Sequence, residues 1–138
     1  MTDQIDTLIR ELEAAMEGSR ELDASIFIEV TPGVKDAGRI DRKGGVVGWW
    51  PKDAPYRSAR EVDPFTTSLD AALSLVPEGW ITMHAGQNPV SGTWYWGLHK
   101  QAEAGVNDGR CQQTASDHQT NSSALALCIA ALKARRGT

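Results

Sequence analysis

Residues 121–136 have the sequence Asn121-Ser122-Ser123-Ala124-Leu125-Ala126-Leu127-Cys128-Ile129-Ala130-Ala131-Leu132-Lys133-Ala134-Arg135-Arg136. The segment predicts a helix, because Ser122 or Asn121 is a favourable N-cap and the basic residues at its end suit the helix dipole. Apolar side chains recur at helical spacing along one face: Leu125, Cys128, Ile129 and Leu132. A helix with such a face must pack against other elements, so this segment is expected in the core.

Three further helices are predicted upstream. Residues 67–77 read as a capped helix that Ser68 or Thr67 opens and Pro77 closes. An amphipathic pattern begins at Ile5, and Ser19 is placed to cap a second helix after it. The end of this second helix is ambiguous, because residues 26–30 also alternate as a short strand would; we favour the helix.

Strand patterns lie between the last two predicted helices. Residues 80–84 and 93–98 predict an antiparallel hairpin around a Gly- and Pro-containing turn, and residues 110–114 predict a third, edge strand. We therefore expect an α/β (α+β) fold: a small antiparallel sheet of about three to four strands flanked by helices, in an alpha-beta-alpha sandwich-like arrangement. The length of 138 residues predicts a single domain, 1–138.

An irregular basic segment at about 33–62 interrupts this pattern. It is rich in Gly and Pro, with strand candidates at residues 46–50 and around Tyr56. Residues 34–60 hold seven Lys and Arg against three Asp, while the whole chain has a formal charge of −4. The overall acidity argues against duplex-DNA binding, but a basic strip on an acidic body is a candidate anion site. The alternative is a solvated loop whose charges keep the chain soluble.

The adjacent tryptophans of this segment, Trp49 and Trp50, must point to opposite faces if they lie on a strand. One of them beside the neighbouring cations would suit a nucleobase and its phosphate, since both stacking and charge contribute. The alternatives are a contact with another subunit or ordinary core packing. The predicted ligand-binding residues are Arg39, Arg42, Lys43, Trp49, Trp50, Tyr56, Arg57 and Arg60.

No motif commits the chain to catalysis. His84, His99 and His118 lack metal-binding spacing, so neither a metal nor another cofactor is predicted. A nucleophilic pair of Cys111 with His84 or His99 would need a lowered thiol pKa, and structural roles are favoured. The start of the chain does not resemble a signal peptide, and no apolar run is long enough to span a membrane; we expect a cytoplasmic protein that does not bind membranes.

The layout resembles a family of small phage and prophage proteins that carry the phage ABA sandwich domain. Three segments support the resemblance: Arg20-Glu21-Leu22-Asp23, Pro64-Phe65-Thr66-Thr67-Ser68-Leu69-Asp70-Ala71-Ala72-Leu73 and Ala126-Leu127-Cys128-Ile129-Ala130-Ala131-Leu132. The resemblance covers about half of the chain and implies a fold and a phage context, with no established catalytic residues. In that case the cytoplasm is that of the host cell.

These observations favour a non-enzymatic phage-type binding protein. It is expected to sequester a small phosphorylated or nucleotide ligand, as a sponge-like anti-defence protein would. The first alternative is a protein-protein interaction module that inhibits or bridges a host or phage protein. The second is a small hydrolase acting on a nucleotide. A homo-oligomer is also expected as an option, because Trp49, Trp50 and the neighbouring arginines could contact another copy of the chain.

Overall fold

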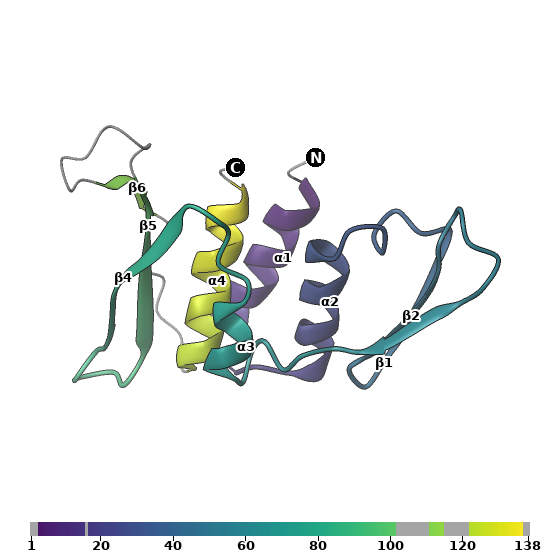
Figure 1. The fold of residues 1–138 in the computed structure, drawn as a ribbon. Helices are drawn as coiled ribbons and strands as arrows, with labels where there is room; N and C mark the ends of the chain where they lie inside the picture. The colour runs from purple at the N-terminus through teal and green to yellow at the C-terminus, as the bar shows by residue number, and fades with distance from the viewer. Residues whose placement is uncertain (1–2, 16, 102–110, 115–121, 137–138) are drawn as a thin grey trace.

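The structure is a computed structural model that describes residues 3–15, 17–101, 111–114 and 122–136 (Figure 1). Within these residues, four helices alternate with two antiparallel sheets. The helices are α1 (Asp3–Ala14), α2 (Arg20–Val30), α3 (Leu69–Leu73) and α4 (Ser123–Arg136). Sheet A consists of β1 (Arg39–Lys43), β2 (Val46–Trp50) and β3 (Ser58–Glu61), and sheet B of β4 (Trp80–Gln87), β5 (Trp94–Gln101) and β6 (Cys111–Thr114).

The predicted mixed α/β class and the small antiparallel sheet are confirmed. The order of the layers differs from the expected alpha-beta-alpha sandwich, because the helices lie between the two sheets (Figure 1). Helix α4 packs on β5 of sheet B, and α2 packs on β2 of sheet A. The difference arises because residues 39–61 form a second sheet, and this sheet covers the far side of the helices.

Helix α4 is buried on all sides, although its sequence predicts a single apolar face. Every residue from Ala124 to Leu132 is buried, and so is Ala134. The alanines bring little side-chain volume, so α1, α3 and β5 can approach the helix closely on their own sides. Its predicted cap is confirmed, since the backbone N–H of Leu125 donates to Ser122 Oγ at 3.2 Å.

Three polar contacts connect the basic end of α4 to neighbouring elements. Lys133 Nζ lies 3.0 Å from Glu13 Oε2, and Arg136 Nη1 lies 2.8 Å from Asp6 Oδ1, so both bridge to α1. Arg135 Nε donates to the carbonyl oxygen of Leu75 at 2.7 Å. Burial lowers the pKa of Arg135, and its Nε–H is used to satisfy a carbonyl just beyond α3.

A buried carboxylate joins α2 to the chain before α3. Helix α2 begins after the predicted cap, Ser19, whose hydroxyl accepts from the N–H of Leu22 at 3.2 Å, and it continues through Val30. Asp23 is fully buried and accepts from the backbone N–H and the hydroxyl of Thr66, at 2.8 and 2.7 Å. Arg20 neutralises it, with Nη1 2.8 Å from Asp23 Oδ2.

The segment predicted to be irregular contains all of sheet A. Strand β2 coincides with the expected strand at 46–50, whereas β3 begins two residues after Tyr56 and β1 was not predicted. The turn between β1 and β2 uses Gly44 and Gly45, both in the left-handed region with φ of 57° and 86°. The predicted hairpin of sheet B and its third strand are confirmed, with a register irregularity between Thr82 and His84.

Candidate functional site

The candidate site lies on the face of sheet A that points away from the helices. Antiparallel pairing sets Arg39 of β1 opposite Trp50 of β2, and Arg57 directly precedes the residue that pairs with Trp49. Arg39 Cζ lies 5.1 Å and Arg57 Cζ lies 4.9 Å from the centroid of the Trp50 ring. Both guanidinium groups therefore make cation–π contacts with the same indole.

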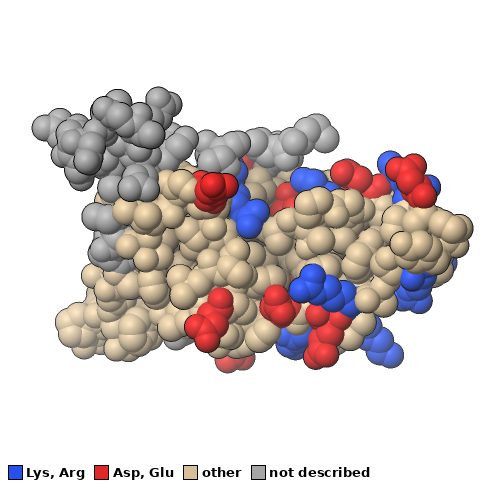
Figure 2. Space-filling model, in the orientation of Figure 1, with Lys and Arg blue, Asp and Glu red and all other residues tan. Residues whose placement is uncertain are grey.

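Asp41 completes this cluster, which we call the Arg39–Trp50–Arg57 face. Its Oδ2 atom lies 3.7 Å from Arg39 Nη2 and 3.6 Å from Arg57 Nη2. The side chains are accessible, with exposed fractions of 69% for Arg39, 47% for Arg57 and 43% for Asp41. Figure 2 shows Lys and Arg gathered over sheet A and α2, with acidic residues among them, whereas the described surface over sheet B is mostly uncharged.

A glycine leaves room for the second guanidinium. Gly48 lies opposite Asp41 in the β1–β2 pair, and a Cβ atom there would be only 2.3 Å from Arg57 Nη2. The Arg57 side chain thus lies across Gly48 and reaches Asp41 above it. Any larger residue at position 48 would push Arg57 off this path.

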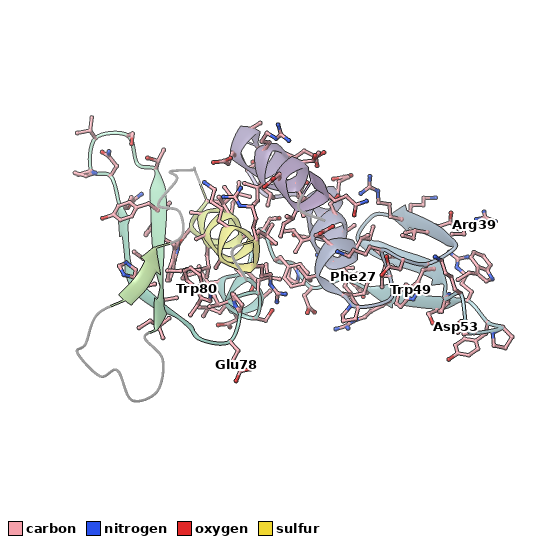
Figure 3. All side chains as sticks on the ribbon, turned by 90° about the horizontal axis from the view of Figure 1, so that it is seen from above. Phe27, Arg39, Trp49, Asp53, Glu78 and Trp80 are labelled. Atoms are coloured by element: carbon pink, nitrogen blue, oxygen red, sulfur yellow. The ribbon has the colours of Figure 1, made fainter. Side chains whose placement is uncertain are left out.

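The opposite face of sheet A packs on α2. Trp49 meets Phe27 with a ring-centroid distance of 5.8 Å, and Arg60 Cζ lies 5.5 Å from the centroid of the Phe27 ring. Arg42 Nη1 donates to Ser25 Oγ at 2.7 Å. Figure 3 shows Phe27 and Trp49 pointing toward each other, with Arg39 at the far side of the sheet.

The eight predicted ligand-binding residues are thus divided by the sheet. Three of them, Arg39, Trp50 and Arg57, form one cluster. On the other face, Arg42, Trp49 and Arg60 lie against α2. The remaining two belong to neither group: Lys43 ends β1 beside the turn, and Tyr56 is 64% exposed in the connection before β3.

Asp41 and Gly48 are parts of the cluster that the sequence analysis missed. A signal for Asp41 was present, because residues 39 and 41 share a face of any strand that contains both. Gly48 could not be predicted as part of the cluster, because its role depends on the path of the Arg57 side chain, which precedes β3.

Three hollows are described on the surface, and none is lined by Arg39, Trp50 or Arg57. Two of them, of about 170 and 430 Å³, share Glu11, Ser25 and Arg42 between α1, α2 and β1. The third, of about 280 Å³, is lined by Gly33, Asp36 and residues 51–54. The Arg39–Trp50–Arg57 face is therefore not part of any of these three hollows.

Of the residues considered for catalysis, the structure describes the side chain of His99 alone. His99 is half-buried on β5, while the side chains of His84, Cys111 and His118 lie outside the described residues. Cys128 Sγ donates to the carbonyl oxygen of Phe65 at 3.0 Å, and burial, followed by the charge of Asp23, raises the pKa of its thiol. This thiol is therefore held in its unreactive, protonated form.

Neither a metal-binding cluster nor a membrane-spanning helix occurs among the described residues. These residues contain no group of three or more His, Cys, Asp or Glu side chains placed to hold a metal ion. None of the described helices has the length and apolar character that crossing a bilayer requires.

Comparison with known proteins gives no match: no protein-family model, curated protein or solved structure is similar to the chain. The resemblance to phage ABA sandwich proteins stays a prediction. Its three segments do meet in the fold, since Asp23 binds Thr66 and Cys128 binds the carbonyl of Phe65. These contacts assign the three segments to core packing.

Proposed function

We propose that this protein is a non-catalytic binding protein that takes a small phosphorylated ligand with an aromatic ring, such as a nucleotide, on the Arg39–Trp50–Arg57 face. The observation that carries the proposal is the convergence of two guanidinium groups on one half-buried indole. Guanidinium groups match phosphate oxygens with paired donors, and an indole offers a stacking surface for a base.

The geometry favours binding because the cluster is already assembled. Both guanidinium groups rest against the Trp50 ring, so less side-chain freedom is lost when a ligand arrives. The distances of 3.6 and 3.7 Å to Asp41 are longer than good charge-assisted hydrogen bonds, so the donors have capacity for a phosphate. A base would stack on the half-buried indole beside the two guanidinium groups.

The cluster offers recognition rather than chemistry. Its polar side chains are two arginines, which only donate, and one carboxylate whose charge both arginines offset. A phage context and a sponge-like anti-defence role are part of the proposal, and the resemblance of the three core segments is their only support. Enzymatic turnover of the same ligand is not proposed.

A second candidate function is contact with a protein partner. The observation in its favour is that Arg39 and Arg57 are 69% and 47% exposed, on a face that lies outside the three described hollows. Exposed Tyr56 stands close by in sequence, and Tyr, Trp and Arg are the residues that contribute most at protein interfaces. An acidic surface of another protein would suit this face.

Calorimetric titration tests the first function. The probes are cyclic dinucleotides, cyclic trinucleotides and ADP-ribose, at about 50 μM protein, which detects affinities of about −6 kcal/mol or better. At least one probe is expected to bind to the wild type and not to Arg57→Ala. The matched control is Arg42→Ala, which removes the same charge from the opposite face and should leave binding unchanged.

The outcomes separate the two candidates. Absence of heat with every probe, or equal losses for Arg57→Ala and Arg42→Ala, contradicts ligand binding at this face. Mass spectrometry of the denatured protein then identifies what the purified chain carried. A co-purified polypeptide that Arg57→Ala loses and Arg42→Ala keeps, with no released small molecule, favours the protein partner.

A further inference from the structure

We infer that Asp41 occupies the position of the ligand's phosphate in the empty protein and competes with that phosphate for the two arginines. The inference rests on the proposed function, because it concerns how Asp41 affects the affinity of the same face for its ligand. Asp41 thereby sets an upper limit on affinity.

The first support is the position of its carboxylate. One oxygen atom, Asp41 Oδ2, lies within 3.7 Å of an Nη2 atom from each arginine, and these arginines come from opposite sides of β2. A point shared by two guanidinium groups is where an oxyanion is bound most favourably. The carboxylate therefore marks the expected place of a phosphate oxygen.

The second support is the space around this point. The residue opposite Asp41 is Gly48, which has no side chain of its own to occupy the surface. The three atoms nearest to the position of an added Cβ at Gly48 all belong to the Arg57 guanidinium, so a polar group fills this space. Both arginines are themselves accessible from solvent, with 69% and 47% of their side chains exposed.

The third support is the exposure of the three groups. Asp41 is 43% exposed, so its carboxylate can turn toward water when a phosphate arrives, and desolvation does not trap it. It stays close to the bound anion, however, because Arg39 and Asp41 share one face of β1. The like charges of the carboxylate and the phosphate then oppose each other and weaken binding.

The experiment compares Asp41→Asn with Asp63→Asn. Asp63 also pairs with an arginine, 3.9 Å from Arg60 Nη2, and is 54% exposed, so its replacement makes the same change in net charge away from the cluster. The probes are inorganic pyrophosphate, ADP and adenosine, measured by calorimetry and by the rise in melting temperature. We expect Asp41→Asn to bind pyrophosphate and ADP about fivefold more tightly, the effect of one charge at about 4 Å in a water-like medium. Adenosine binding and all results for Asp63→Asn should match the wild type.

Three results would overturn the inference. Weaker binding by Asp41→Asn would show that Asp41 positions the arginines instead of competing for them. An equal gain in affinity for Asp63→Asn would show that the effect comes from the change in net charge alone. A gain for adenosine as large as that for pyrophosphate would place Asp41 against the base.

The proposed function can fail separately. If the wild type binds none of the cyclic nucleotides, ADP-ribose, pyrophosphate or ADP but Asp41→Asn binds the last two, Asp41 does hold the anion position and the proposed function is wrong. If no variant binds pyrophosphate or ADP, the inference is wrong, and the titrations with cyclic nucleotides and ADP-ribose decide the proposed function separately.

Discussion

Asp23 Oδ1 accepts hydrogen bonds from both the backbone N–H and the hydroxyl of Thr66, at 2.8 and 2.7 Å. The pair connects α2 to the segment before α3, 43 residues further along the chain. Arg20 extends the network, since its Nη2 atom donates to the carbonyl oxygen of Val62 at 2.6 Å. The end of sheet A, helix α2 and the start of α3 are thus held together by one buried charge.

Thr66→Val should lower the free energy of unfolding by about 1–3 kcal/mol, because it removes one hydrogen bond to the buried Asp23 carboxylate and the side-chain acceptor of the Ser19 N–H. The lost hydroxyl serves both Asp23 and the backbone N–H of Ser19, which donates to it at 3.0 Å. Urea unfolding measures the change. Thr67→Val, at the exposed neighbouring position, is the matched control and should change stability little. Equal losses for the two variants would contradict a structural role for the network.

Gly48→Ala should abolish ligand binding while keeping the fold. The new Cβ would displace the tip of the flexible Arg57 side chain, and the backbone itself would not have to move. Calorimetry with the best nucleotide probe and thermal unfolding measure the two effects. Gly38→Ala is the control, since nothing lies within 4 Å of its added Cβ. Wild-type affinity in Gly48→Ala would show that Arg57 does not need to reach Asp41.

The two adjacent tryptophans should respond differently to replacement. Trp50→Leu removes the stacking surface and should weaken nucleotide binding by about 1–3 kcal/mol, with a smaller effect on pyrophosphate. Trp49→Leu removes packing on Phe27 and should lower stability instead. Calorimetric titration measures the affinity of both variants, and urea unfolding measures their stability. If Trp49→Leu also lost affinity at unchanged stability, the ligand would lie on the helix side of sheet A.

Cys128 should make the fold sensitive to alkali. Burial raises the pKa of its thiol above the unfolded value, so above about pH 8.5 the unfolded chain loses a proton that the folded chain keeps. The free energy of unfolding should then fall by about 1.4 kcal/mol per pH unit, relative to Cys128→Ala, and be independent of this group below that pH. Urea unfolding from about pH 7.5 to about pH 10 measures the difference. If the free energy of unfolding changed equally with pH in the wild type and in Cys128→Ala, the thiol would not be buried and protonated.

Local chemistry accounts for the elements that could be predicted. Helices α2, α3 and α4 begin after hydroxyl caps that can be identified from the residues alone, because each cap satisfies an N–H three positions away. The sheet B hairpin likewise follows from two Trp-rich strands around a turn. Strand β1 could not be predicted, since residues 39–43 carry four charges and become a strand only through pairing with β2.

The residue types of the site could be predicted from the sequence, but their arrangement could not. Strand alternation required Trp49 and Trp50 to face opposite ways, and the basic residues around them could be listed from the sequence. Which tryptophan faced solvent depended on α2 covering one side of sheet A with Phe27. The pairing register then brought Arg39 and Arg57 to Trp50 and sent Arg42 to Ser25.

The amino-acid order alone therefore established the helix caps, the opposed tryptophans and the local excess of positive charge, because these depend on neighbours within about one turn or one strand. The convergence of Arg39 and Arg57 on one indole, with Asp41 within 3.7 Å of both, came from the packing of the complete chain. It required three strands in a defined register and a helix on one side of them. Contacts between residues distant in sequence depend on how hydrophobic surfaces are buried together, and no short segment specifies that outcome.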